Sequence, residues 1–171
     1  MEKPIEIVST KKQKDKINYK ELLKITVNEE HQCVAINVVS KEFKKQKDYT
    51  EFYSEVDRLM IKSLKYAKEK FNKNTITILA DLNGFMIKHV DYSFFKTAIP
   101  YFNDRFPDNM EKVILVNIPV FFKACYNIVS MFIHPDTKEK ILFEKSKKYK
   151  KKFGKSNFTN NLDEIDDSDE E

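Results

Sequence analysis

The chain has 171 residues, of which 41% are hydrophobic and 34% are charged, so it can form one globular domain with a sizeable core and a solvated surface. The formal net charge is +4, yet residues 163–171 carry seven acids and no base, so the rest of the chain is strongly basic. With Gly84 and Gly154 as its two glycines, the sequence excludes a phosphate-binding loop and a dinucleotide fingerprint.

Residues 1–18 are rich in lysine and weakly patterned, and residues 5–8 are a candidate edge strand. This segment lacks the long apolar run of a secretory signal. Residues 22–27 and 33–39 are β-rich runs around a short polar segment and predict a β-hairpin. Asp48 opens a long helix to about residue 72, with Glu51 placed to complete a capping box. The helical period of its apolar residues predicts a buried face formed by Phe52, Val56, Leu59, Met60, Leu64, Ala67 and Phe71.

Residues 75–80 predict a strand that ends in Asp81, and residues 91–105 predict a helix with a kink or a restart at Pro100. Residues 112–117 predict another strand, after which Pro119 favours the first helical position of the next helix. Residues 140–143 predict a last short strand. Because strands alternate with helices, we expect an α/β domain whose mostly parallel sheet is covered by helices on both faces.

Residues 120–133 predict a helix that is apolar around nearly all of its circumference. Its polar residues Lys123, Asn127 and Ser130 lie three or four positions apart and form one narrow stripe. The run contains a lysine and is shorter than the about 20 apolar residues that span a membrane. The helix must therefore be covered by the protein's own core, by bound lipid or by a membrane surface, and periodicity alone favours the core.

Candidate catalytic and metal-binding groups are sparse. His31, His89 and His134 lack metal-ligand spacing, and no serine stands in a nucleophile elbow, so we expect no metal site and no cofactor. Asp81 follows a strand, where α/β enzymes place catalytic groups, and defines a minor hydrolase hypothesis. It can equally brace the turn before Gly84, which is the interpretation we favour because no second catalytic group accompanies it.

The cysteines and the C-terminal charges indicate the environment of the protein. Cys33 and Cys125 lie in apolar segments and predict reduced, buried thiols in a reducing, cytoplasmic compartment. Residues 144–161 are rich in lysine, and residues 162–171 form an acidic tail that we expect to be disordered. The lysine-rich segment predicts either a solvated extension or a contact with an anionic membrane, while its few aromatic residues predict no nucleic-acid binding.

Five short motifs follow one another within residues 20–143. They are a strand ending in Asp-x-x-Gly (residues 81–84), a helix end like Tyr-Pro-Glu-Arg (106–109), a strand ending in Asn-x-Pro (117–119), an aromatic-rich helix (120–133), and a Pro-Asp-Thr turn followed by Lys-Ile (135–141). In this order and spacing they resemble the CRAL-TRIO lipid-binding domain family. The resemblance implies that residues 19–143 form a parallel sheet under an apolar pocket, with residues 120–133 as a mobile gate helix. It also implies a short form without the family's N-terminal helical module, and no enzymatic activity.

The resemblance assigns candidate site residues. In phosphatidylinositol-binding members, residues matching Thr137 and Lys140 contact the phosphate, and a glutamate matching Asp108 orients the lysine. Asp108 is one methylene shorter than that glutamate, so its carboxylate reaches less far towards Lys140. The alternative is that Lys140 is an exposed lysine at the strand edge. The resemblance further implies a pocket floor of Ile76, Ile78 and Leu115, a gate and pocket surface of Phe121, Phe122, Cys125, Ile128, Val129 and Phe132, and a structural motif of Asp81, Gly84, Asn117 and Pro119.

We therefore expect a cytoplasmic protein that binds one hydrophobic lipid or phospholipid, with phosphatidylinositol as a candidate, for transfer or presentation at anionic membranes. The alternative is a protein-interaction module of the same fold, with a filled pocket, that binds a small GTPase or another partner. Free volume beneath residues 120–133 distinguishes the two hypotheses.

Overall fold

The computed structural model of the chain describes residues 16–145, and the expectations for residues 1–15 and 146–171 lie outside this range. In chain order its elements are α1 (Tyr19–Leu22), β1 (Leu23–Asn28), β2 (Cys33–Val39), the 3-10 helix η1 (Ser40–Glu42), α2 (Thr50–Phe71), β3 (Ile76–Asp81), η2 (Ile87–His89), α3 (Tyr92–Arg105), β4 (Met110–Val116), α4 (Phe122–Val129), η3 (Ser130–Phe132), α5 (Pro135–Glu139) and β5 (Ile141–Glu144).

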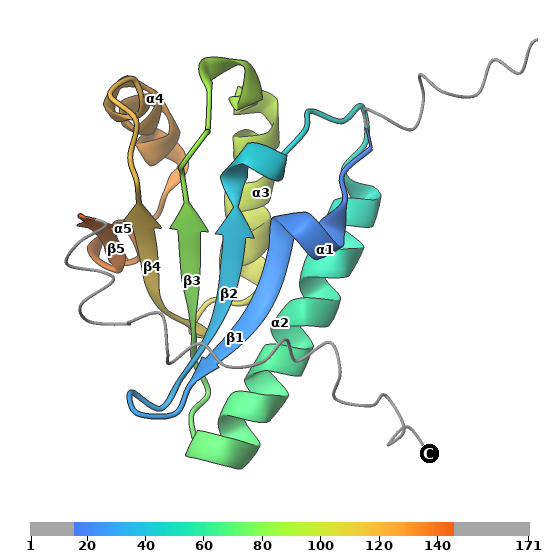
Figure 1. Ribbon diagram of the computed structural model, residues 1–171, viewed down its shortest axis with the longest axis vertical. Coiled ribbons are helices and arrows are strands. Elements are labelled where there is room, and N and C mark those ends of the chain that lie inside the picture. Colours follow the sequence, from blue (N-terminus) through green and yellow to red (C-terminus); the bar gives the residue numbers. More distant parts are fainter. Residues whose placement is uncertain (1–15, 146–171) are drawn as a thin grey trace, which may run out of the picture.

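The strands form one sheet in the order β1-β2-β3-β4-β5, in which β1 and β2 are antiparallel and all other neighbours are parallel. The predicted hairpin and the predicted mostly parallel α/β sheet are thus confirmed. Each parallel connection moves to the next strand in the same direction, so right-handed crossovers bring their helices to one face. Figure 1 shows α2 and α3 on the same face, and the expected covering of both faces by helices is not found within residues 16–145.

Helix α2 buries the apolar face that its sequence period predicts. Phe52, Val56, Leu59, Met60 and Ala67 are buried, and Leu64 and Phe71 pack against the same core. The predicted capping box is wrong: Oδ1 of Asp48 accepts hydrogen bonds from the Thr50 N–H (3.0 Å) and hydroxyl (2.7 Å), while Glu51 pairs with Lys16 at 3.1 Å. The helix ends at Asn72, which adopts a left-handed conformation with φ of 54°.

Helix α3 begins at a well-defined cap and is not interrupted. Oδ1 of Asp91 accepts hydrogen bonds from the N–H groups of Ser93 (3.0 Å) and Phe94 (3.2 Å). Oδ2 of Asp91 accepts the hydroxyl of Tyr49 at 2.7 Å, which ties the start of α3 to the start of α2. Pro100 lies exposed inside the helix, which continues to Arg105, so the helix does not restart at this residue.

The predicted helix over residues 120–133 is shorter than expected and far from fully covered. Pro119 precedes the helix, and its carbonyl accepts the N–H of Phe122 at 3.0 Å, so it does not occupy the first helical position. Helix α4 stops at residue 129 and continues as η3. Cys125 is its buried residue, whereas Val120 is 99% and Met131 is 71% exposed. The expectation that nearly all of this segment is hidden is therefore wrong.

Candidate functional site

An apolar cavity of about 280 Å³ lies between α4 and the sheet. This volume is about twice that of an engineered 150 Å³ apolar cavity that binds benzene, so it can accept a hydrocarbon guest. No residue of the lining carries a formal charge at neutral pH. The sheet contributes Val38, Ala80, Val113, Leu115 and Ile141; the β3–α3 connection and α3 contribute Leu82, Phe85, His89, Val90, Phe94, Phe95 and Ile99; α4 and the segment after it contribute Phe122, Cys125, Tyr126, Val129 and Ile133; and Leu22, Ser40, Phe43 and Phe52 complete it.

Strand alternation explains why the sheet presents apolar side chains to the cavity. Ala80 of β3 pairs with Leu115 of β4, and Val113 of β4 pairs with Ile141 of β5, so these four residues share one face. The intervening Ile114 belongs to a separate buried cluster. The floor of the cavity is therefore the second half of β3 together with β4 and the start of β5.

Helical spacing explains the contribution of α4. Phe122, Cys125, Tyr126 and Val129 follow the i, i+3, i+4, i+7 pattern and line the cavity together. Lys123 and Asn127, two members of the predicted polar stripe, are exposed on the other side.

Three of the six residues predicted for the gate and pocket line the cavity, namely Phe122, Cys125 and Val129. The other three lie outside it: the Phe121 ring stacks on Phe85 with centroids 6.2 Å apart, Ile128 is 43% exposed, and the Phe132 ring lies 5.9 Å from the ammonium of Lys96. The reason is that α4 presents a single face to the cavity and ends before residue 132.

Only one of the three residues predicted for the pocket floor lines the cavity. This residue is Leu115, whereas Ile76 and Ile78 lie outside the lining. Ile76 is 1% exposed and lies in the core beneath α2, with Ile78 packed against that core. Helix α2 covers the first half of β3, so the cavity reaches this strand only at Ala80.

The predicted headgroup residues lie away from the cavity. Lys140 and Lys112 line a separate polar groove of about 390 Å³, and Ile141, the residue after Lys140, lines the cavity. Asp108 is exposed, and no ion pair joins it to Lys140 in the part of the chain that the structure describes. Thr137 lies in α5, where its carbonyl accepts the Lys140 N–H at 3.1 Å.

The predicted structural motif forms a clamp between the carboxyl ends of β3 and β4. Oδ1 of Asp81 accepts the N–H of Asn83 at 2.9 Å and the side-chain amide of Asn117 at 2.7 Å. Asn117 has φ of 54° and Gly84 has φ of 72°, both in the left-handed region that asparagine and glycine tolerate best. Asp81 thus acts as the brace of this turn.

Sequence reasoning missed the part of the lining contributed by the β3–α3 connection. His89 is the main example, because its Nδ1 accepts the N–H of Met86 at 3.0 Å and its ring lies 5.5 Å from that of Phe85. Burial lowers the pKa of His89, with a smaller contribution from Lys88, and favours the neutral imidazole. The aromatic residues at 85, 94 and 95 were the available signal for this wall.

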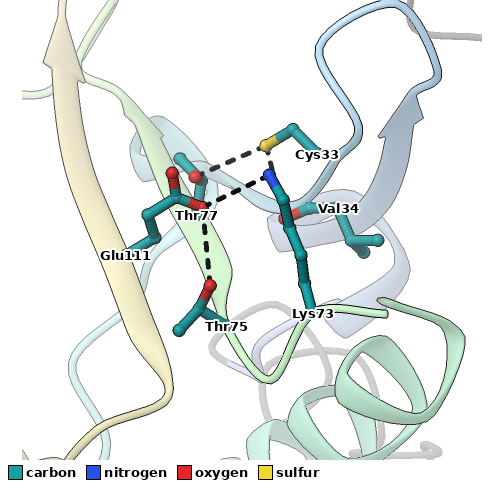
Figure 2. Close-up of polar contacts among 6 residues, drawn as sticks. All are labelled: Cys33, Val34, Lys73, Thr75, Thr77 and Glu111. Carbon is teal, nitrogen blue, oxygen red and sulfur yellow. Dashed lines mark hydrogen bonds and ion pairs between the residues drawn. The ribbon is translucent and has the colours of Figure 1, made fainter. Parts of the chain in front are cut away.

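A second polar cluster lies at the amino-terminal end of β3 and β4 (Figure 2). The thiol of Cys33 donates to the hydroxyl of Thr77 at 3.4 Å, while Glu111 accepts the hydroxyl of Thr75 at 3.5 Å and pairs with Lys73 at 4.0 Å. Burial raises the pKa of the Cys33 thiol. Both cysteines of the chain are free, as predicted, but Cys125 is buried and Cys33 is half-buried, so the predicted burial is wrong for Cys33.

Residues 16–145 lack two further features, a metal-binding cluster and a membrane-spanning helix. No three histidine, cysteine, aspartate or glutamate side chains in this range gather to hold a metal ion. None of the helices in the same range has the length and hydropathy to cross a bilayer.

The CRAL/TRIO domain family model matches residues 17–163, so the chain belongs to the CRAL/TRIO domain family. A phosphatidylinositol transfer protein, CSR1 of Eremothecium gossypii, is 33% identical over 73 residues, which are 43% of this chain and 17% of that protein. The crystal structure of Sfh5 matches 77% of this chain with a TM-score of 0.56 and 18% identity, which shows a shared fold. The chain corresponds to 49% of the Sfh5 chain, so it spans less than half of either protein.

Proposed function

We propose that this chain is a lipid-binding protein that holds the hydrophobic part of a lipid in the cavity beneath α4 and transfers or presents it at membranes. The observation that carries the proposal is the uncharged, apolar cavity of about 280 Å³. A cavity that excludes charge and retains free volume suits a hydrocarbon guest. The open cavity also argues against the alternative of a filled pocket in a protein-interaction module.

We further propose that residues 119–133 are the gate of the cavity. Their anchoring is weak, because α4 buries a single residue, Cys125. The Sγ of Cys125 accepts the hydroxyl of Tyr92 at 3.6 Å, and sulfur is a weak hydrogen-bond acceptor. Segments with few buried apolar contacts open at low free-energy cost. Movement of this segment away from α3 is therefore the simplest route for a guest to enter the cavity.

The edge of the sheet beside the gate supports a membrane contact. Ile87, Val120 and Met131 are 69%, 99% and 71% exposed. Lys88 directly follows Ile87, Lys123 lies three residues after Val120, and both lysines are exposed. Exposed apolar side chains flanked by lysines suit the surface of an anionic bilayer. We propose that the protein docks there by this edge while the gate opens.

The test is native mass spectrometry of the full chain after incubation with vesicles of phosphatidylcholine and phosphatidylinositol. We expect one bound lipid per chain, and we expect Ala80→Phe, which fills the cavity, to abolish it. Ala124→Phe is the matched control, because Ala124 is exposed on α4 outside the cavity. A chain that retains its circular dichroism spectrum and carries no lipid refutes the proposal.

Phosphatidylinositol is a second candidate ligand, because the similar protein CSR1 is a phosphatidylinositol transfer protein. In this hypothesis Thr137, Lys140 and Asp108 serve the phosphate, and Lys140 shares its groove with Lys112. Lys140→Ala should then weaken uptake of phosphatidylinositol more than Lys138→Ala, which removes the same charge from an exposed site on α5. Equal losses would show that general charge alone matters.

A further inference from the structure

The face of the sheet opposite the cavity carries an apolar patch. Strand alternation directs each strand residue that neighbours a cavity-lining residue to this opposite face. The patch, which we call the back patch, consists of Leu79 in β3, Ile114 and Val116 in β4 and Leu142 in β5. Leu79 pairs with Ile114, and Ile114 pairs with Leu142, so the back patch is continuous across three neighbouring strands.

Most of the back patch is buried although no described helix lies over it. Leu79, Ile114 and Val116 are 8%, 4% and 4% exposed and form a buried cluster of their own. Within residues 16–145 no helix residue joins this cluster, whereas the core on the other face includes side chains of α2 and α3. Figure 1 shows both helices on that other face. Because parallel sheets are covered on both faces, the burial of the back patch points to a cover from outside this range.

The chain leaves the described range beside the back patch. Strand β5 ends at Glu144, which pairs with Val116. Two strand spacings, about 10 Å, separate β5 from β3. Phe153 lies nine residues after Glu144, and a chain of this length reaches about 30 Å when extended, so Phe153 can reach all of the patch. The CRAL/TRIO family model continues to residue 163, so the matched domain includes residues 146–163.

Residues 146–163 have a composition that complements this face. Phe153 and Phe158 are large apolar side chains among polar ones, and an aromatic side chain can bury about 150–250 Å². The run before Phe153 is rich in lysine, and the groove beside α5 offers three carboxylates against two ammonium groups. The groove is lined by Glu111, Lys112, Asp136, Glu139, Lys140 and Leu142. Since Leu142 also belongs to the back patch, the chain meets the negative groove first and the apolar patch next.

We propose that the back patch is the docking site of the chain's own residues 146–163, with Phe153 and Phe158 on the patch and the preceding lysines along the groove. The docked segment closes the second face of the sheet and holds β5, whose Ile141 lines the cavity on the first face. This inference goes beyond the proposed lipid binding and does not depend on it. It assigns the lysine-rich segment to the domain itself, in place of a solvated extension or a membrane contact.

The test uses tryptophan fluorescence, because the full chain contains no tryptophan. In Phe153→Trp the single indole reports whether residue 153 is covered. We expect blue-shifted emission and acrylamide quenching several-fold weaker than that of free tryptophan, at every protein concentration and without vesicles. Emission like that of free tryptophan in buffer overturns the inference. A blue shift that appears only at high protein concentration, or only with phosphatidylserine vesicles, also overturns it, in favour of a second copy or a membrane as the partner.

Two substitutions on β5 show whether this tryptophan lies on the back patch. Leu142→Ser, added to Phe153→Trp, removes a patch side chain and should shift the emission to the red and increase quenching. Phe143→Ser is the matched control, because Phe143 pairs with the cavity-lining Leu115 on the other face and is 49% exposed. It should leave the emission unchanged, and circular dichroism checks that both variants fold. Equal shifts in the two variants, or no shift in Leu142→Ser, overturn the inference.

Discussion

One face of the sheet is packed in two different ways. Beneath α2 the space is filled by a buried cluster that includes Leu59, Met60 and Ile76, each 2% exposed or less. Beneath α4 the same face borders a cavity of about 280 Å³. Helix α2 has 22 residues and six buried side chains, whereas α4 has 8 residues and one buried side chain. The comparison indicates that the α2 half stabilises the fold and the α4 half is free to bind a ligand.

The largest expected effect comes from truncating a side chain in each half. Leu59→Ala in α2 removes a residue that is 2% exposed and should cost about 2–5 kcal/mol of unfolding free energy. Val129→Ala in α4 enlarges an existing cavity and loses few contacts, so it should cost about 1 kcal/mol or less. Urea denaturation measures both values. Equal losses would mean that α4 is as firmly packed as α2, which contradicts the proposed gate.

A medium effect is expected at the clamp between the two halves. Asn117→Val removes the hydrogen bond to Asp81 and places a β-branched residue at φ of 54°, which should cost about 1–3 kcal/mol. Asn117→Gly removes the same hydrogen bond but tolerates this φ, so its loss should be smaller. Thermal denaturation of both variants provides the measurement. If glycine is as destabilising as valine, backbone strain has no part in the effect.

The comparison also explains how much of the structure the sequence predicts. The hairpin, the buried face of α2 and the turn that Asp81 braces through the Asn83 N–H depend on local periods and turn residues, and each was predictable. The cavity wall depends on tertiary packing: Ser40 and His89 both line the cavity although 48 residues separate them in the sequence. A lone histidine and a lone serine carry no local signal that they line one cavity.

Two differences from the predicted site have a local physical reason. The left-handed Asn117 and the turn closed by the Phe122 N–H on the Pro119 carbonyl (3.0 Å) delay the start of the helix to Phe122. Lys140 is the C-cap residue of α5 and precedes β5, so it does not belong to the strand that reaches the cavity. It lines the separate groove, while Ile141, the first residue of β5, lines the cavity.

A smaller effect, of opposite sign, is expected when the hollow half is filled. Ala80→Leu adds aliphatic volume to the cavity and should raise the unfolding free energy by about 0.5–2 kcal/mol. The same substitution should remove the increase in melting temperature that a bound lipid produces in the unmodified chain. Differential scanning calorimetry with and without dodecanol measures both quantities. Unchanged stabilisation by dodecanol would place its binding site outside the cavity.

The smallest effect concerns the filled half at alkaline pH. Burial, followed by the hydrogen bond to Asp91, raises the pKa of Tyr49 to about 12, and burial with a hydrogen bond to Asp57 raises the pKa of Tyr101 to about 12. The unfolded chain releases these protons near pH 10, so the folded state binds more protons between pH 10 and 12. This stabilisation is complete below pH 10 and is lost as the pH rises towards 12. Urea denaturation measures the unfolding free energy between pH 10 and 12. In the double variant Tyr49→Phe/Tyr101→Phe this free energy should fall less steeply with pH. An unchanged slope would mean that other groups cause the loss of stability.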